Sequence, residues 1–426
     1  MKSDKAHQNK PASGGKAGRS PLVVIFLTIF IDLVGFGIII PTMPYIAREF
    51  GASASDIGML MSVYSFTQFL FSPFWGGLSD RIGRRPAILI SLFGCAISYF
   101  IFAFAHSLMI LFVARALAGA FGGNISTAHA YIGDVTAPEE RSKGMGLIGA
   151  AFGLGFVFGP IIGGLLGIVG QKLGSAPPLG LSFAALGVGI LCLCNFTFAW
   201  FSLKESLSPE MRAKSRDKKR AKRFAAIYQQ IRRPVAGPLI VVYFLSGLAM
   251  AQMEAMLIPY MADKFKWGLK LTTYGFAYIG VIMLVTQGYL IRKWMPKFGE
   301  PKILVVGLVL FTISLFGIGS ASLITFVALS MTLLALGNGM MRPPNLGIIS
   351  LVTPADEQGL SMGVTNSLAS LGRIIGPALG GFLYENINSS APFMGAGVVA
   401  FMALALTALN YRNLPALGAS KSQASH

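Results

Sequence analysis

The chain has 426 residues, of which 54% are hydrophobic and only 12% are charged. A soluble globular domain carries about a quarter charged residues, so this composition excludes an ordinary soluble protein and favours a membrane protein. The net charge of +18 suggests nucleic acid at first, but its distribution, described below, indicates membrane topology, and we expect no nucleic-acid partner. The three cysteines lie inside apolar segments, so we expect no disulfide framework and no metal site.

Long apolar segments follow one another along nearly the whole chain. Each is close to the length of about 20 residues that crosses a bilayer as a helix. The segments fall at residues 22–47, 57–77, 87–105, 108–132, 142–168, 179–201, 237–261, 272–294, 302–320, 323–349, 358–384 and 391–411. A polar, densely basic stretch separates the sixth segment from the seventh. The sequence therefore predicts an all-α integral membrane protein with 12 transmembrane helices in two pseudo-symmetric six-helix bundles.

Charge predicts the orientation of these helices. Most of the 35 basic residues fall in the two tails, in the basic stretch and in the loops on the same side. The other side holds only Arg48, Lys172, Lys264, Lys266 and Lys270. By the positive-inside rule both termini lie in the cytoplasm of a multi-pass plasma-membrane protein, and the basic side contacts anionic lipid head groups. The N-terminal tail has no apolar core of its own, so we expect no removed signal peptide.

The resulting domain boundaries follow the chain from end to end. They are a cytoplasmic tail at 1–20, an N-terminal bundle at 21–201, a basic cytoplasmic linker at 202–236, a C-terminal bundle at 237–411 and a second cytoplasmic tail at 412–426. Residues 211–233 of the linker either lie along the membrane as a basic helix or form a solvated connection.

Between the second and third segments lies a short charged link. It reads Gly76-Gly77-Leu78-Ser79-Asp80-Arg81-Ile82-Gly83-Arg84-Arg85-Pro86. Two membrane helices joined by so short a link form a hairpin, and the charged residues must reach water. An ordinary basic loop that only anchors the topology is the alternative interpretation.

A glycine and proline pattern occurs once in each half. The two copies are Gly155-x-x-x-Gly159-Pro160-x-x-Gly163-Gly164 and Gly372-x-x-x-Gly376-Pro377-x-x-Gly380-Gly381. Glycines four residues apart share one helix face and allow another helix to approach closely, and the proline bends the helix. Two homologous halves predict a binding cavity at their interface. Generic tight packing is the alternative for the pattern itself.

These motifs resemble those of the major facilitator superfamily. The charged link is similar to the loop between helices 2 and 3 of that family, and the glycine pattern resembles its antiporter motif in span 5. Leu111-x-x-x-Arg115-x-x-x-Gly119 resembles the arginine motif of span 4. The first half most resembles the twelve-span drug/proton antiporters, within them the tetracycline-exporter-like group. True tetracycline antiporters carry a histidine in span 8, and residues 272–294 contain none.

The resemblance implies a cytoplasmic latch formed by Gly76, Asp80, Arg81, Gly83, Arg84, Arg85 and Asp134. When the cytoplasmic side is closed, Asp80 is expected at the N-terminus of span 11, where free N–H groups favour an anion. Arg81 is expected to pair with Asp134 at the end of span 4. Gly76 and Gly83 are expected to permit close helix approach and a turn.

Charges inside the membrane are costly and are functional candidates by default. Asp32 lies midway through span 1, and Glu254 lies in span 7. A carboxyl group in a low-dielectric cavity can take a proton from one side and release it to the other, so we expect both acids to carry protons, with Arg115 modulating them. A structural hydrogen bond is the alternative for Asp32. For Glu254, the alternative is pairing with Arg342 or Arg373.

Other polar residues in the spans are weaker candidates for lining a substrate cavity. They are Tyr64, Gln68, Asn124, His129, Gln252, Asn338, Asn345 and Asn366. His129 is equally consistent with a histidine satisfied by its own helix.

The chain lacks a catalytic set and a nucleotide-binding loop. We therefore expect no enzyme activity, no cofactor and no use of ATP, with a proton gradient as the driving force. The leading interpretation is a monomeric, proton-coupled exporter of amphipathic drugs or other small organic molecules, whose partners are the substrate, protons and membrane lipids. The alternatives are uptake or symport of a metabolite, flipping of a lipid head group, and a scaffold that recruits a partner through residues 209–222.

Overall fold

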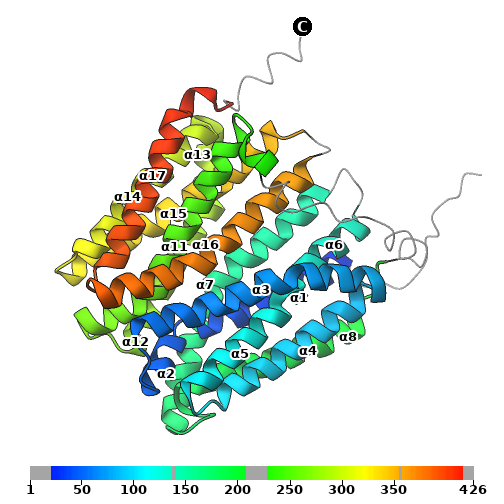
Figure 1. Ribbon diagram of the computed structural model, residues 1–426, viewed down its shortest axis with the longest axis vertical. Helices are drawn as coiled ribbons and strands as arrows, with labels where there is room; N and C mark the ends of the chain where they lie inside the picture. The colour runs from blue at the N-terminus through cyan, green and yellow to red at the C-terminus, as the bar shows by residue number, and fades with distance from the viewer. Residues whose placement is uncertain (1–20, 137–140, 208–227, 355–356, 416–426) are drawn as a thin grey trace, which may run out of the picture.

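The computed structural model describes residues 21–136, 141–207, 228–354 and 357–415, and these form helices and turns without a β-strand. The N-terminal half contains α1 (Pro21–Ile39), α2 (Met43–Glu49), α3 (Ala54–Ile82), α4 (Arg84–Ala103), α5 (Leu108–Phe121), η1 (Gly122–Asn124), α6 (Ile125–Val135), α7 (Arg141–Leu173), η3 (Gly180–Ser182) and α8 (Phe183–Ser202). The C-terminal half contains α11 (Ala236–Phe265), α12 (Leu269–Val285), η4 (Thr286–Leu290), α13 (Ile291–Phe298), α14 (Glu300–Ser320), α15 (Ile324–Val352), α16 (Gln358–Asn386), α17 (Ala391–Leu409) and η5 (Tyr411–Asn413) (Figure 1). The predicted tails at 1–20 and 416–426, and residues 208–227 of the predicted linker, lie outside the described residues.

Among the described residues, ten helical segments are long and apolar enough to cross a membrane. The helices α3 and α16, each of 29 residues, complete the predicted twelve. Both carry many Gly, Ser and amide side chains. This composition suits their position, because they pack against each other between the two halves.

The helices of three predicted spans are interrupted, and the length of the apolar segments did not indicate this. The first is split, because α1 ends at Ile39 and α2 begins at Met43; Pro41 and Pro44 lack the N–H groups that a continuous helix would use there. The fourth contains one turn of 3₁₀ helix, η1, at two consecutive glycines. The eighth contains a π-helical turn, η4, between α12 and α13. Such turns often mark functional sites in helices.

Glycine forms the tight turn between α3 and α4. Gly83 has a φ of 110°, a conformation that residues with a side chain rarely adopt. The pseudo-equivalent Gly299, between α13 and α14, has a φ of 78°. We call the end of the molecule that carries this turn the Gly83 end, and the opposite end, which carries α2, the α2 end.

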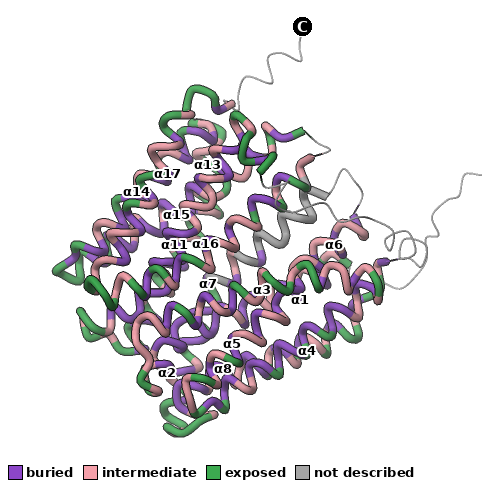
Figure 2. The backbone as a smooth tube through the Cα atoms, viewed as in Figure 1, coloured by how far each residue is buried: buried purple, intermediate pink, exposed green. Residues whose placement is uncertain are grey.

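The outer surface of the helices is apolar. On α4, for example, Ile90, Phe93 and Ile97 form an exposed stripe with helical spacing. Buried residues concentrate where helices pack against one another, and exposed residues follow the outer edges of both halves (Figure 2). An exposed apolar surface of this kind is stable in lipid rather than in water.

The two halves meet chiefly through two helix pairs, α3 with α16 and α7 with α12. The helices α3 and α16 lie side by side near α2 and diverge toward the opposite end (Figure 1).

Candidate functional site

The repeated glycine pattern packs α7 against α1. A methyl group on Gly159 would lie 2.6 Å from the Cα of Gly37, and one on Gly155 would lie 2.9 Å from the side chain of Leu33. Gly163 meets the backbone of Ile38 even more closely. Because no side chain fits at these distances, the three glycines set the approach of the two helices. Pro160 lies inside α7 beside this contact.

The second copy repeats the arrangement in the other half. Gly372, Gly376 and Gly380 face α11, where a methyl group on Gly376 would lie 2.7 Å from the carbonyl oxygen of Leu248. The glycine pattern therefore packs two helices closely in each half, which confirms the predicted tight packing and the pseudo-symmetry of the two halves.

The last glycine of each copy contacts the opposite half instead of its own. Gly164 on α7 packs against Thr273 on α12. Gly381 on α16 packs against the start of α3, where an added methyl would lie 2.8 Å from the Cα of Ser55. One pattern therefore joins helices within a half and, through its final glycine, joins the halves at the α2 end.

A lock of polar side chains closes the α2 end. Arg48 on α2 donates two hydrogen bonds to Asp263 on α11, at 2.7 and 2.8 Å. Tyr384 on α16 donates to the same carboxylate at 2.6 Å. The hydrogen bonds to Asp263 raise the pKa of the Arg48 guanidinium further above its usual range, so the arginine keeps its charge at every physiological pH. We call these three residues the α2-end lock.

Sequence reasoning missed this lock. Arg48 and Asp263 belong to different halves, and no spacing rule connects residues so far apart. One sequence feature could have drawn attention to Arg48: it is one of only five basic residues assigned to this side of the membrane.

Further contacts extend the closed region to the middle of the helices. Tyr45 donates to the carbonyl of Trp267 at 3.1 Å and shares a hydrogen bond of 2.8 Å with Thr272. Ser62 on α3 donates to the carbonyl of Ile374 on α16 at 2.7 Å.

Beyond Ser62, α3 and α16 part (Figure 1). One face of α16 is formed by residues 363, 366, 370, 374, 377 and 381. The C-terminal part of this face, from residue 374 to residue 381, contacts the start of α3. On the same face toward the Gly83 end, Gly363 and Asn366 are exposed. Among the described residues, the hydrogen bonds and the ion pair that join the halves all lie on the α2 side of this point. The conformation is therefore closed at the α2 end and open toward the Gly83 end.

Asp32 lies in the middle of α1 and is partly buried. Together with Asn124 it lines a small pocket between α1, α4 and α6. Within the part of the chain that the structure describes, its carboxylate has no hydrogen-bond or ion-pair partner. The alternative of a structural hydrogen bond thus finds no support in this conformation.

Glu254 on α11 is also partly buried. Arg342 on α15 and Arg373 on α16 lie within electrostatic range of its carboxylate. Neither comes within ion-pair distance of it among the described residues. The predicted direct pairing with Arg342 or Arg373 is therefore absent in this conformation among the described residues, and proton exchange at Glu254 stays a prediction.

Arg115 is almost fully buried, with 2% exposure. Its guanidinium lies over the ring of Tyr64 at 4.5 Å from the centroid, and its Nε is 3.4 Å from the carbonyl oxygen of Leu60. Nη1 has no hydrogen-bond partner among the described residues. Arg115 therefore faces α3 in this conformation, and its predicted approach to an acid stays a prediction.

Tyr64 lies at the point where the halves part. Gln68, one turn further along α3, donates to the carbonyl of Gly122 at 3.1 Å and contacts the Tyr64 hydroxyl at 3.4 Å. Arg373, from the other half, lies within electrostatic range of the same tyrosine. The charged groups of both halves thus converge at one level of the bundle.

Two of the weaker cavity candidates are occupied elsewhere. Gln252 was predicted to line the cavity, and this is wrong: it is fully buried, and its Nε2 donates to the carbonyl of Pro392 at 2.7 Å, joining α11 to α17. His129 has its Nδ1 2.9 Å from the carbonyl oxygen of Ile125, so it is satisfied by its own helix.

The other predicted cavity residues of the C-terminal half are Asn338, Asn345 and Asn366. Asn338, Arg342 and Asn345 share one face of α15. Both of these asparagines are buried, and their Oδ1 atoms have no hydrogen-bond partner among the described residues. Asn366 is exposed on the face of α16 that opens toward the Gly83 end.

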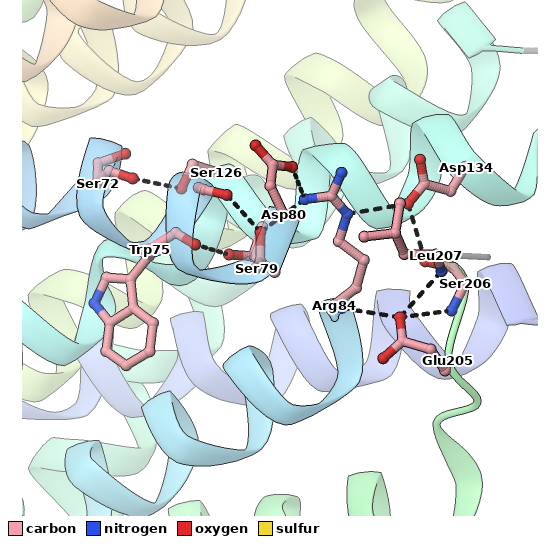
Figure 3. Close-up of polar contacts among 12 residues, drawn as sticks. Ser72, Trp75, Ser79, Asp80, Arg84, Ser126, Asp134, Glu205, Ser206 and Leu207 are labelled. Carbon is pink, nitrogen blue, oxygen red and sulfur yellow. Dashed lines mark hydrogen bonds and ion pairs between the residues drawn. The ribbon is translucent and has the colours of Figure 1, made fainter. Parts of the chain in front are cut away.

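The charged link at the Gly83 end forms a network centred on Arg84 (Figure 3). Its Nη1 donates to Asp80 at 2.5 Å and to Ser79 at 2.7 Å, and its Nε donates to Asp134 at 3.0 Å. The side chain joins the end of α3 to the end of α6. With 7% exposure, Arg84 is a largely buried cation shared between two carboxylates.

The predicted pair of Arg81 with Asp134 is wrong. Arg81 is in the last turn of α3 and points to the outside, where it is exposed. The turn at Gly83 directs Arg84 inward instead, in the first turn of α4. Arg85 donates to the carbonyl of Trp200 at 2.7 Å and lies over its ring.

Other latch predictions have mixed outcomes. Gly76 has room for a methyl group, whose nearest neighbour would be Ser126 at 3.8 Å, so no close approach requires a glycine there. Asp80 was predicted to meet the start of α16 when this end is closed; because this end is open, that contact stays a prediction. The residue before α16, Glu357, forms an ion pair with Arg233.

Sequence reasoning also missed Glu205, which follows α8. Its carboxylate accepts hydrogen bonds from the backbone N–H groups of Arg84 at 2.9 Å and Arg85 at 3.3 Å, so it caps the N-terminus of α4. The next residue, Ser206, donates to Asp134 at 3.1 Å. The sequence did contain one signal for Glu205, which is an acidic residue at the start of a densely basic linker.

Two six-helix halves that meet at one end, part toward the other and each hold a carboxyl group within the membrane define a two-bundle membrane transporter. A family model described as Major Facilitator Superfamily matches residues 25–298 and 288–425. The chain therefore belongs to the major facilitator superfamily.

Relatives match this chain over nearly its whole length. It is 31% identical to the class C tetracycline resistance protein of Escherichia coli over 392 residues, which is 91% of this chain and 95% of the relative. It is 29% identical to multidrug resistance protein 2 of Bacillus subtilis (strain 168), over 90% of this chain and 94% of the relative.

Solved structures share the fold. The crystal structure of a bacterial homologue of the human lysosomal transporter Spinster, inward-facing and occupied, has a TM-score of 0.72 at 14% identity, over 94% of this chain and 98% of that chain. The human organic anion transporter MFSD10 (TETRAN) has a TM-score of 0.67 at 24% identity, over 92% of this chain and 100% of that chain.

Proposed function

We propose that this protein is a proton-coupled exporter of amphipathic drugs or other small organic molecules. The observation that carries the proposal is a partly buried acid in each half, Asp32 and Glu254, with no direct ion-pair partner among the described residues. The relatives support this proposal, because a tetracycline resistance protein and a multidrug resistance protein match 91% and 90% of the chain. A transporter of this family acts on its substrate without chemical conversion.

The charge distribution supports placing the Gly83 end in the cytoplasm, with both termini. The observed conformation is then open to the cytoplasm and closed to the outside by the α2-end lock. Substrate enters between α3 and α16 and reaches the level of Tyr64, Arg373 and Glu254. The halves then rock about this level, and the Gly83 end closes while the α2 end opens.

Exchange follows because substrate binding and protonation of the two acids compete. Protons leave the acids on the cytoplasmic side as substrate binds, and protons from outside displace the substrate after the halves have rocked. One proton moving down 100 mV releases about 2.3 kcal/mol before any pH gradient is added. That energy is enough for about a 50-fold accumulation of substrate.

The test is transport in inside-out membrane vesicles. A proton gradient should drive accumulation of a fluorescent amphipathic drug by the wild-type protein. Asp32→Asn and Glu254→Gln should each abolish the dependence on the gradient while drug binding remains measurable. If both variants accumulate drug in response to the gradient as the wild type does, the proposed coupling is wrong.

A further inference from the structure

Asp32 lines a small pocket that lies entirely within the N-terminal half. The pocket lies between α1, α4 and α6, and its walls include Thr28, Asp32, Leu92, Asn124 and Ala128. Every wall residue belongs to the N-terminal half. A substrate moving between the halves does not pass through it.

The size of the pocket restricts its occupant. It has room for about one water molecule, whereas sites for drug-sized ligands measure about 300 Å³ or more. Asn124 therefore cannot contact a drug through this pocket, and its predicted role in the substrate cavity does not fit its position.

The polar groups in the walls fit a water molecule. Asn124 is 7% exposed, and no described residue makes a hydrogen bond with its side chain. Asp32 lies opposite, equally without a partner in the described part. Thr28 donates its hydroxyl to the carbonyl of Val24 at 2.9 Å and keeps lone pairs to accept another bond. A bound water would have three partners here, within the usual range of two to four.

The surroundings favour a proton carrier over a metal cation. Three oxygen-bearing side chains with one charge are too few for the six to eight oxygens that Ca²⁺ takes or the octahedral shell of Mg²⁺. The other titratable groups in electrostatic range of Asp32 are Tyr64 on α3, Cys95 on α4 and Cys192 on α8. All three are of types that are neutral near pH 7.

The pocket lies on the cytoplasmic side that the proposed function assigns. Its other α1 residues precede Asp32 in a helix that begins at the Gly83 end, and Leu92 is within the first three turns of α4. A proton that leaves Asp32 through the pocket moves toward the Gly83 end.

We propose that this pocket binds a water molecule that accepts the proton from Asp32, and that Asn124 positions this water. The proposal rests on the proposed function, and it separates the path of the proton from that of the substrate within the N-terminal half. In the step itself, the Asp32 carboxylic acid gives its proton to the water, leaving a carboxylate and a hydronium ion. The acid is reloaded from the outside after the halves have rocked.

Infrared difference spectroscopy on the full-length protein in lipid can test this. The C=O band of protonated Asp32 is assigned by its loss in Asp32→Asn and is followed as the pH is changed. Asn124→Leu removes the amide at similar volume, and Ala128→Leu fills the pocket. Ala130→Leu, on the same helix but outside the pocket, is the matched control. Drug binding by each variant confirms that it is folded.

Both pocket variants should move the Asp32 band to higher frequency, because the carboxyl group loses a hydrogen bond. They should also slow drug-triggered proton release about tenfold, the equivalent of one hydrogen bond lost in the transition state, with drug affinity unchanged. The control should match the wild type in both measurements.

An Asp32 band and a release rate that stay at the wild-type values in both pocket variants would overturn the proposal, because Asp32 would then exchange protons through the inter-half cavity. A band that responds to sodium at constant pH would overturn it in favour of a cation site. A failure of the proposed function looks different: no drug triggers proton release in the wild type, yet the band still reports on the pocket.

Discussion

Arg84 is buried, whereas Arg81 and Arg85 are more exposed. Its guanidinium forms ion pairs with both Asp80 and Asp134. Replacing it leaves Asp134, whose side chain is 11% exposed, without its cation. Breaking a buried ion pair costs about 3 kcal/mol or more.

Arg84→Ala should therefore lower the apparent melting temperature in detergent by about 5 °C. Arg81→Ala, on an exposed side chain, should change it by about 1 °C or less. A thermal scan with a thiol-reactive dye measures both. Equal effects of the two substitutions would show that the assignment of Arg84 as the central cation is wrong.

The residue type at these positions was predictable, but the partner was not. The acid and the arginines of the link could be picked out from the sequence, and so could Asp134. Which arginine reaches Asp134 depends on the direction in which the chain leaves Gly83, and that direction is a matter of backbone angles. Arg48 and Asp263 lay beyond any local pattern, because only the packing of the two halves brings them together.

At the scale of helices, the final glycine of each repeated pattern is the contact between halves. A methyl group on Gly381 would lie 2.6 Å from the carbonyl oxygen of Ala54. Overpacking of this kind costs about 1–3 kcal/mol, and here the cost falls only on the conformation closed at the α2 end.

Gly381→Ala should thus reduce drug export about tenfold or more, while the protein still reaches the membrane in normal amounts. Gly268→Ala is the control, since Gly268 is exposed at the same end of the molecule and its methyl group would meet nothing within 4 Å. Export by Gly381→Ala at the level of Gly268→Ala would argue that α3 and α16 need no close approach.

The helices themselves were largely readable from the sequence. Twelve apolar segments predicted the number of spans, and the repeated glycine pattern predicted helix faces that another helix approaches closely, without identifying that helix. The interruptions at residues 40–42, at η1 and at η4 were not predicted, because an apolar run has the same composition whether its hydrogen-bond pattern continues or breaks. Hydropathy alone also ranks α3 and α16 below the other spans, since their polar residues serve the interface between halves.

At the scale of the whole molecule, the α2-end lock holds one of two alternating conformations. The ion pair is partly exposed, with side-chain exposures of 32% and 44%, so we assign it only about 1 kcal/mol. That is enough to shift a conformational equilibrium about fivefold.

Arg48→Ala should therefore increase the population that is open at the α2 end. Spin labels on cysteines introduced at Glu49 and Lys270, both exposed positions, report the distance across this end once the native cysteines are replaced. The charge swap of Arg48→Asp with Asp263→Arg should restore the short distance. An unchanged distance distribution in Arg48→Ala would remove the lock from the mechanism.

Counting protons released per drug molecule bound to the purified protein is the most direct measurement of the coupling. Drug added to wild-type protein in weakly buffered solution should release protons, and Asp32→Asn and Glu254→Gln should each release fewer at equal drug occupancy. If both variants release as many protons as the wild type, the two acids are not the groups that exchange protons for drug.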